Sequence, residues 1–210
     1  MKNERIQALI AEGKVIERQT GMLRQTVINL ANGNGRRVTE LEVQKVINFV
    51  SEYIEHAPAL MTLIEDATAN YDERENVRPI LEATEEYFLT AEDIIPDRLG
   101  LVGLLDDAYL THSLMQAISD RVKSHTGKSL LPMEPHADNA FIRRLIGEPF
   151  ASILDEQVAA TLAGPSLQEN IHEITIVLSQ LNLASGPDPI WGYALVSGIS
   201  DARIDALGVF

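Results

Sequence analysis

Four aspartates in a short, otherwise apolar stretch are the residues of this chain best suited to chemistry. Asp93 and Asp97 stand on either side of Pro96, and the adjacent pair Asp106 and Asp107 follows farther along the same stretch. Carboxylate oxygens are the ligands that Mg²⁺ and Ca²⁺ prefer in proteins. If the four side chains converge, a bound ion there would activate water and steady a phosphate group, as in a metal-dependent hydrolase. The preceding segment could add a further ligand from Glu85 or Glu86.

A structural role for the same aspartates is the first interpretation, and the metal site is its alternative. Pro96 disfavours the helical conformation for the residue before it, so a new helix is expected to start near Pro96 or Asp97, with Asp93 placed to cap it. Asp106 and Asp107 are neighbours on the next helix, about 100° apart, so one can face inward while the other faces solvent.

A buried carboxylate in this stretch needs hydrogen-bond donors. The sequence offers helix N-terminal amides, the guanidinium of Arg98, and the hydroxyls of Tyr109 and Thr111. Gly100 and Gly103 permit a tight turn or a close approach between helices.

The motif resembles the YkvA-like family, a bacterial domain of unknown function, over about residues 85–115. The resemblance rests on matching positions at Asp93, Ile95, Pro96, Asp97, Gly103, Asp106 and Asp107. It implies a helical fold and brings no activity, cofactor or catalytic residue with it.

Other catalytic signatures are missing from the sequence. The chain has no cysteine, which excludes disulfides, thiolate metal sites and cysteine nucleophiles. The five histidines lack the Glu-x-x-His spacing of di-iron bundles, and His112 is expected to be an ordinary partly buried or surface histidine. The run 126–129 contains Gly127 and Lys128 but lacks the upstream glycine of a phosphate-binding loop.

The composition is that of a globular protein, with 45% apolar and 23% charged residues in a chain of 210. The N-terminus lacks the pattern of a signal peptide, and no window is apolar enough to cross a membrane. We therefore expect a cytoplasmic protein without a membrane span.

The charge is divided unevenly along the chain. The total is −14, yet residues 1–37 hold seven Lys or Arg against three Glu, a local charge of +4, which leaves −18 for the rest. Two interpretations stay open: the basic segment packs on an acidic body, its own or a neighbour's, or it reaches a separate acidic partner. Nucleic acid is disfavoured as a partner except through residues 1–37.

Apolar periodicity predicts helices along most of the chain. Residues 3–32 form one helix or two, weakened at Gly13 or Gly21. A capping box at Thr39 and Glu42 starts a helix that runs to about residue 55, and Pro58 lies in the first turn of another. Further helices are expected around 80–88 and at about 101–123, 138–146, 149–162 and 166–183.

The predicted fold is all-α, an irregular multi-helix bundle with a long N-terminal helix and a C-terminal arm. Its parts are a basic helical segment (1–37), a YkvA-like helical core (38–125), C-terminal helices packed on that core (137–185) and an apolar arm (186–210). We expect a non-enzymatic accessory protein that forms a homo-oligomer or binds a protein partner. No cofactor is expected. A hydrolase that uses Mg²⁺ or Ca²⁺ and a nucleic-acid-associated protein are the alternatives.

Overall fold

All regular structure in the described residues is helical, which confirms the predicted all-α fold. The computed structural model of the chain describes residues 2–68, 74–89, 94–127, 129, 131 and 136–180. The predicted arm at 186–210 and Asp93 lie outside these residues. The helices, in chain order, are α1 (Lys2–Thr20), α2 (Met22–Gly33), α3 (Glu40–Thr68), α4 (Arg74–Leu89), the 3₁₀ helix η1 (Asp97–Val102), α5 (Leu105–Thr126), α6 (His136–Ile146), α7 (Phe150–Leu162) and α8 (Pro165–Gln180).

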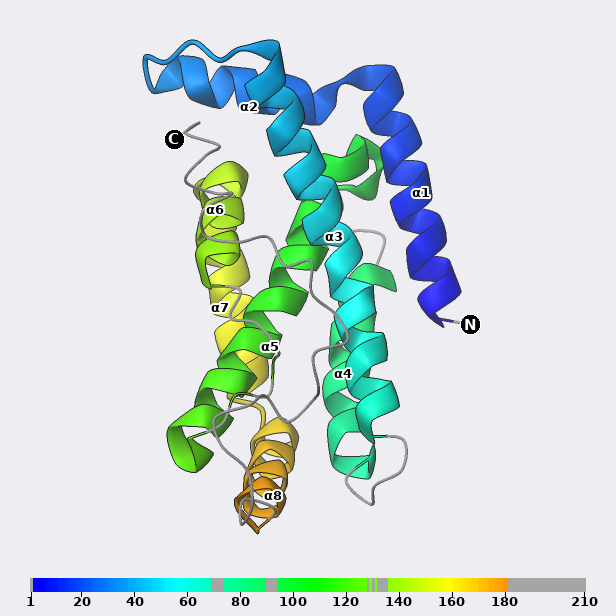
Figure 1. Cartoon of the computed structure of the whole chain (residues 1–210), viewed down its shortest axis with the longest axis vertical. Helices are drawn as coiled ribbons and strands as arrows, with labels where there is room; N and C mark the ends of the chain where they lie inside the picture. The colour runs from blue at the N-terminus through cyan, green and yellow to red at the C-terminus, as the bar shows by residue number, and fades with distance from the viewer. Residues whose placement is uncertain are drawn as a thin grey trace.

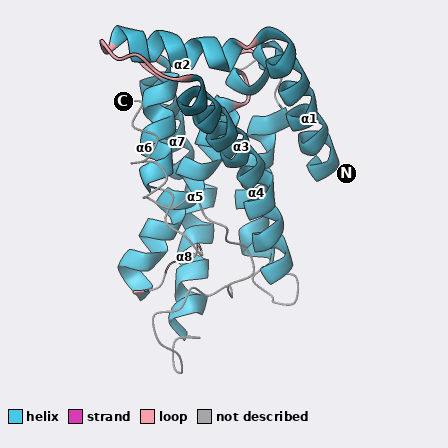
Figure 2. Cartoon of the chain, turned by 45° about the horizontal axis from the view of Figure 1, so that its top comes forward, coloured by secondary structure: helices cyan, strands magenta, loops and turns pink. Residues whose placement is uncertain are grey.

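Helix α5 runs through the middle of the molecule (Figure 1). It contacts α3 and α4 on one side and α6, α7 and α8 on the others. Helix α1 rises from the N-terminus along the outer edge of the bundle, and α2 crosses its top, as the tilted view in Figure 2 also shows. Residues 103–112 are all buried, because other helices surround the first half of α5.

The break between α1 and α2 falls at Gly21, one of the two predicted positions. Gly21 has φ 62° and ψ 31°, a left-handed conformation that favours glycine. Glu17 reaches across this break, and its carboxylate accepts hydrogen bonds from the amides of Leu23 (2.8 Å) and Arg24 (3.1 Å). A glutamate in α1 therefore caps the start of α2.

The start of α3 confirms the capping box, and its course corrects the prediction at Pro58. The Thr39 amide donates to Glu42 Oε2 at 2.7 Å, and the Glu42 amide donates to Thr39 Oγ1 at 3.3 Å. The predicted helix end near residue 55 is wrong, because α3 continues through Pro58 to Thr68. Ile54 and Ala57 are fully buried around the proline, and this packing offsets the lost backbone hydrogen bond.

The acidic motif begins with a short 3₁₀ helix rather than with a long α-helix. Pro96 is extended, with φ −62° and ψ 130°, and η1 starts at Asp97 as predicted. Gly100 then adopts φ 71° and ψ −132°, a conformation open essentially to glycine alone. This kink delays the start of α5 to Leu105, so the predicted start near residue 101 is wrong.

The C-terminal helices agree with the prediction to within a few residues. The expected segments 138–146, 149–162 and 166–183 correspond to α6, α7 and α8. One hydrophobic cluster joins residues from α1 through to α8, so the described helices share a continuous core. None of the described helices combines the length and apolar content that crossing a membrane requires.

Candidate functional site

The aspartate pair of the motif lies inside the protein. Asp106 and Asp107 occupy the first turn of α5, and each is only 1% exposed. Oδ2 of Asp106 accepts a hydrogen bond from the amide of Ile95 at 2.9 Å. The carboxylate of Asp106 thus ties the segment before η1 to the start of α5, where the helix dipole also favours negative charge.

The predicted division between an inward and an outward aspartate is therefore wrong. Both side chains are buried because other helices cover the start of α5 on all sides. Of the donors that the sequence offered, the backbone amide of Ile95 serves Asp106, whereas the Tyr109 hydroxyl donates to Asp155 instead. Arg98 is exposed, and Thr111 is fully buried one turn beyond Asp107.

The other residues proposed as metal ligands lie at the margins of this region. Asp97 is the first residue of η1, with its side chain outside the described part, and Asp93 lies outside it altogether. In α4, Glu85 is half-buried and Glu86 is exposed. Within the described residues, no group of three or more His, Asp or Glu side chains is placed to hold a metal ion. A metal site that includes Asp93 and Asp97 stays a prediction.

Five residues beyond Asp107 in α5, His112 forms a buried contact between α5 and α3. Its Nε2 lies 3.0 Å from the carbonyl oxygen of Tyr53, and the two rings have centroids 4.2 Å apart. Burial lowers the pKa of His112 to about 4, so the ring is neutral at physiological pH. With a carbonyl as its partner, Nε2 carries the proton and donates. His112 is more deeply buried than the sequence led us to expect, and it makes a specific contact between two helices.

A chain of polar side chains leads from Tyr53 toward the surface. The Tyr53 hydroxyl donates to Asn139 Oδ1 at 2.6 Å, and Asn139 Nδ2 donates to Gln116 Oε1 at 2.6 Å. Gln116 in turn contacts His136, which pairs with Asp120 at 3.4 Å. These contacts join α3, α5 and α6, and they satisfy polar groups that would otherwise be costly to bury.

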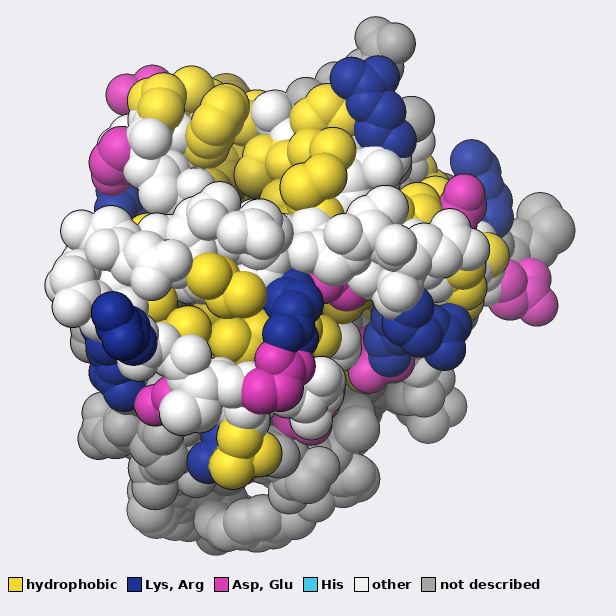
Figure 3. Space-filling view, turned by 90° about the horizontal axis from the view of Figure 1, so that it is seen from above, with side chains coloured by type: hydrophobic (Ala, Val, Ile, Leu, Met, Phe, Trp, Pro, Cys, Tyr) yellow, Lys and Arg dark blue, Asp and Glu magenta, His cyan; other side chains and the backbone are white. Residues whose placement is uncertain are grey.

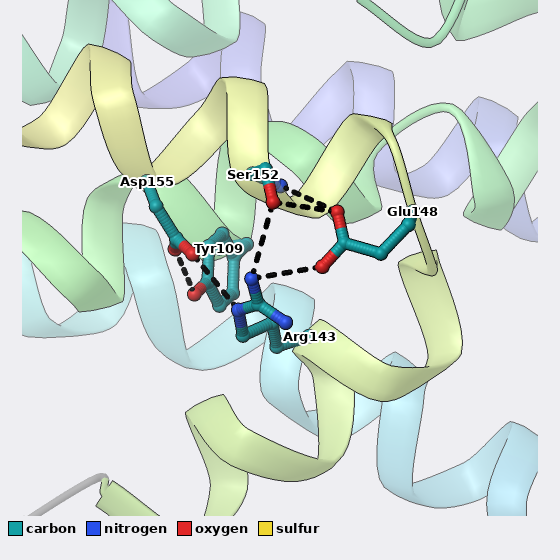
Figure 4. A network of polar contacts seen from close by, with 5 residues as sticks. All are labelled: Tyr109, Arg143, Glu148, Ser152 and Asp155. Carbon is teal, nitrogen blue, oxygen red and sulfur yellow. Dashed lines mark hydrogen bonds and ion pairs between the residues drawn. The ribbon is translucent and has the colours of Figure 1, made fainter.

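A second polar network links α5 to the turn between α6 and α7 (Figure 4). The Tyr109 hydroxyl donates to Asp155 Oδ1 at 2.6 Å, and Arg143 Nε donates to Asp155 Oδ2 at 2.8 Å. Arg143 also pairs with Glu148 at 3.0 Å, and the Ser152 hydroxyl donates to Glu148 at 2.6 Å. Arg143 therefore bridges two carboxylates on the surface of the bundle.

The contacts of this network change the pKa values of three of its residues. Burial, followed by the hydrogen bond to Asp155, raises the pKa of Tyr109 to about 12. The hydrogen bond to Asp155 also raises the pKa of Arg143. The Ser152 hydroxyl and then Arg143 lower the pKa of Glu148. These shifts stabilise a neutral phenol and charged side chains, which suits a structural network.

Helix α1 packs closely over η1. A Cβ atom at Gly100 would lie 2.9 Å from Ile16 Cγ2 and 3.0 Å from the carbonyl oxygen of Gly13. A Cβ atom at Gly13 would lie 2.7 Å from Leu104 Cδ1. The two glycines thus let α1 approach the acidic motif more closely than any larger residue allows.

The basic N-terminal segment uses several cations within its own chain. Lys14 pairs with Glu55, Arg24 with Glu40, and Arg36 with Glu42, so α1, α2 and the following turn are tied to α3. Seen from above, several basic side chains stand beside acidic ones, and the basic side chains do not merge into one continuous field on that face (Figure 3). The segment packs on the acidic body of the same chain, which is the first of the two interpretations of the charge division.

Sequence reasoning missed the buried Glu17 and the surface network around Arg143. Glu17 could have been found, because it precedes the helix-breaking Gly21 by four residues and can reach the free amides of the next helix. The contact of Tyr109 with Asp155 depends on the packing of α5 against α7, and no local pattern signals it.

Fold and site together define a class: an all-helical protein with an acidic motif buried at the start of its central helix. Residues 86–112 match the family described as "Protein of unknown function (DUF1232)". This match is consistent with the resemblance to the YkvA-like family, and it covers the end of α4, η1 and the first part of α5. No curated protein and no solved structure matches the chain.

Proposed function

We propose that this protein is a non-enzymatic accessory protein that acts by binding a protein partner or further copies of itself. The observation that carries the proposal is the burial of Asp106 and Asp107, each 1% exposed. The carboxylate of Asp106 is engaged by the Ile95 amide and holds two segments of the fold together. Carboxylates in such a position support a helical scaffold and are poorly placed to meet a substrate from solvent.

The surface supplies further support for a binding role. Phe150 and Ile153 stand on one face of α7 at a spacing of three residues, with 42% and 44% of their surface exposed. Leu41 at the start of α3 is 66% exposed. Large apolar side chains are common at the centre of protein contacts, so the pair on α7 is a candidate contact surface.

Native mass spectrometry of the untagged full chain, with and without a chelator, tests the proposal. A metal-free oligomer is the expected result. A metal-free monomer would remove self-association and leave a different protein as the partner. A divalent ion lost on chelation, together with a hydrolytic activity lost in a folded Asp107→Asn variant, would replace the proposal with the hydrolase alternative.

The basic segment 1–37 offers a separate test of the nucleic-acid alternative. Its cations Lys14, Arg24 and Arg36 already pair with glutamates of α3. We therefore expect little binding of the full chain to duplex DNA or RNA at physiological salt. Tight binding that weakens steeply as salt is raised would favour the nucleic-acid alternative instead.

A further inference from the structure

Helix α7 carries apolar side chains on two of its faces. Ala151, Leu154 and Val158 are buried on the inner face, where α7 packs on α5, α6 and α8. On the outer side, Phe150 and Ile153 keep 42% and 44% of their surface exposed. A helix at the surface of a bundle usually presents polar residues to water, so its second apolar face distinguishes α7 as a contact surface.

The outer residues of α7 follow the spacing of a helix–helix contact. Phe150, Ile153, Gln157 and Ala160 stand at steps of three, four and three residues, and all four are exposed. Residues at this spacing lie along one stripe of a helix and form the contact line between paired helices. We call these four residues the α7 seam. Glu156 lies at the edge of the seam, about 100° around the helix from Gln157.

Side-chain size changes along the α7 seam in a way that suits a second copy of the same helix. The large side chains Phe150 and Ile153 lie in the first half, Ala160 lies in the second half, and Gly164 follows just beyond the helix end. When two copies of α7 pair antiparallel about a two-fold axis at Gln157, the large half of each faces the small half of the other. Ile153 then packs over Ala160 of the other copy, and Phe150 packs toward Gly164. A parallel pair would place the two large halves against each other and leave a gap between the small ones.

The polar residues of this face fit the same arrangement. Gln157 lies on the two-fold axis, where the amide of each copy can donate to the side-chain carbonyl of the other. A single polar residue within an apolar seam fixes the register of a helix pair. The two copies of Glu156 approach each other at the rim of the contact, where water and salt screen their repulsion. A parallel pair would hold the two glutamates on opposite sides, so their approach marks the antiparallel arrangement.

We infer that the α7 seam forms a homodimer contact in which two copies of α7 pair antiparallel about a two-fold axis at Gln157. The inference rests on the proposed binding function and specifies its partner as a second copy of this chain. Helix α7 has 13 residues and is therefore only about 20 Å long. A contact of this size is small, so the dimer exchanges with the monomer and its population depends on protein concentration.

Sedimentation velocity of the untagged full chain between about 5 and 500 µM tests the inference, and a reversible monomer–dimer equilibrium is expected. Ile153→Glu places a charge in both halves of the contact and should weaken the dimer at least about tenfold. The matched control is Leu41→Glu, which changes a 66% exposed leucine at the start of α3 and should dimerise as the wild type does. Both positions are exposed, so circular dichroism should show wild-type helix content in both variants.

Mixed dimers test the antiparallel arrangement. Glu156→Lys brings two lysines together in its own dimer, but a dimer with the wild type pairs a lysine with a glutamate. Native mass spectrometry of the variant mixed with an equal amount of ¹⁵N-labelled wild type should therefore show more mixed dimer than the half that random pairing gives. Glu173→Lys is the control, because it changes an exposed glutamate of α8 and should pair at random.

The outcomes separate this inference from the function on which it rests. A chain that stays monomeric up to about 500 µM would overturn the dimer and leave a different protein as the partner, so the accessory function would stand. A dimer that Ile153→Glu leaves as tight as Leu41→Glu does, or random pairing of Glu156→Lys with the wild type, would overturn the α7 contact and place the dimer on another surface. The accessory function itself fails only if the chelator-sensitive hydrolytic activity is found.

Discussion

Helix α5 is held by carboxylates in two different settings, one buried and one at the surface. At its buried start, Asp106 is 1% exposed and accepts a backbone amide. At the surface, Asp155 keeps 42% of its side chain exposed and accepts from Tyr109 and Arg143. The first joins consecutive segments of the family motif, whereas the second joins helices that are distant in the sequence.

The difference shows what each carboxylate can contribute. Removing a buried carboxylate leaves its donor without a partner away from water, so the full desolvation cost falls on the folded state. A surface carboxylate exchanges protein partners for water at little net cost. Residues 86–112 contain both Asp106 and its partner Ile95, so this contact lies within the family segment, whereas the contact of Tyr109 with Asp155 joins the segment to α7.

The largest expected effect comes from breaking the buried side of this comparison. Asp106→Ala leaves the Ile95 amide without its acceptor and opens space in the first turn of α5. We expect a loss of about 3 kcal/mol in the free energy of unfolding. Urea denaturation of both proteins measures it directly. Asp106→Asn keeps an acceptor oxygen and should lose less, and equal losses in the two variants would mean that the hydrogen bond to Ile95 is not the cause.

A second variant disturbs the motif without changing its charge. Gly100→Ala places a Cβ atom 2.9 Å from Ile16 Cγ2 in a backbone conformation that alanine disfavours. Strain and the displaced α1 should cost about 2–3 kcal/mol. Differential scanning calorimetry gives the change in melting temperature. Gly127→Ala is the control for positive φ alone, because a Cβ atom there would meet nothing within 4 Å. Equal losses at the two glycines would argue against close packing of α1 on η1.

Much of the fold could be predicted because its signals are local. The capping box at Thr39, the break at Gly21 and the helix start after Pro96 each depend on residues within a turn of one another. The predictions failed where packing overrides local preference. Pro58 stays inside α3 because Ala57 before it and Met61 after it are buried. Helix α5 starts late because Gly100 adopts a positive-φ conformation, which glycine permits but does not require.

The candidate site was predicted less completely than the fold. The acidic motif could be identified from the sequence alone, since pairs of acidic residues within an apolar run are distinctive. The burial of both Asp106 and Asp107 depends on α5 being the central helix, which no periodicity in the motif reveals. The hydrogen bond between Tyr109 and Asp155 could not be predicted either, because it depends on how α5 packs against α7.

His112, a third buried polar residue on the same helix as the pair, sharpens the comparison through pH. Its pKa is about 4 in the folded protein and about 6.5 in the unfolded chain, so between these values the unfolded chain binds the proton and the folded protein does not. Stability must therefore fall as the pH falls through this window. We expect a loss of about 2 kcal/mol between pH 7.5 and pH 5 from this group. Urea denaturation at several pH values measures it.

The control for this pH dependence is His112→Gln, which cannot take up the proton. The difference in stability between wild type and variant should shrink as the pH falls toward 5. Protonation of carboxylates affects both proteins equally and therefore cancels in this difference. His136, which is exposed and pairs with Asp120 at 3.4 Å, provides the surface counterpart. If His136→Gln removes the pH dependence and His112→Gln does not, the buried histidine is not the group that titrates.

The smallest expected effect comes from breaking the surface side of the comparison. Asp155→Ala removes the partner of both Tyr109 and Arg143. Arg143 keeps Glu148, and water can take the place of the partly exposed Asp155 side chain beside the buried Tyr109 hydroxyl. The loss should be at most about 1 kcal/mol, since partly exposed ion pairs contribute little. It should also shrink between 0.1 M and 1 M NaCl, because salt screens the attraction to Arg143. Urea denaturation at the two salt concentrations measures both effects. A loss as large as that of Asp106→Ala, unchanged by salt, would mean that the Asp155 network carries as much of the fold as the buried motif does, and the contrast between the two sets of carboxylates would fail.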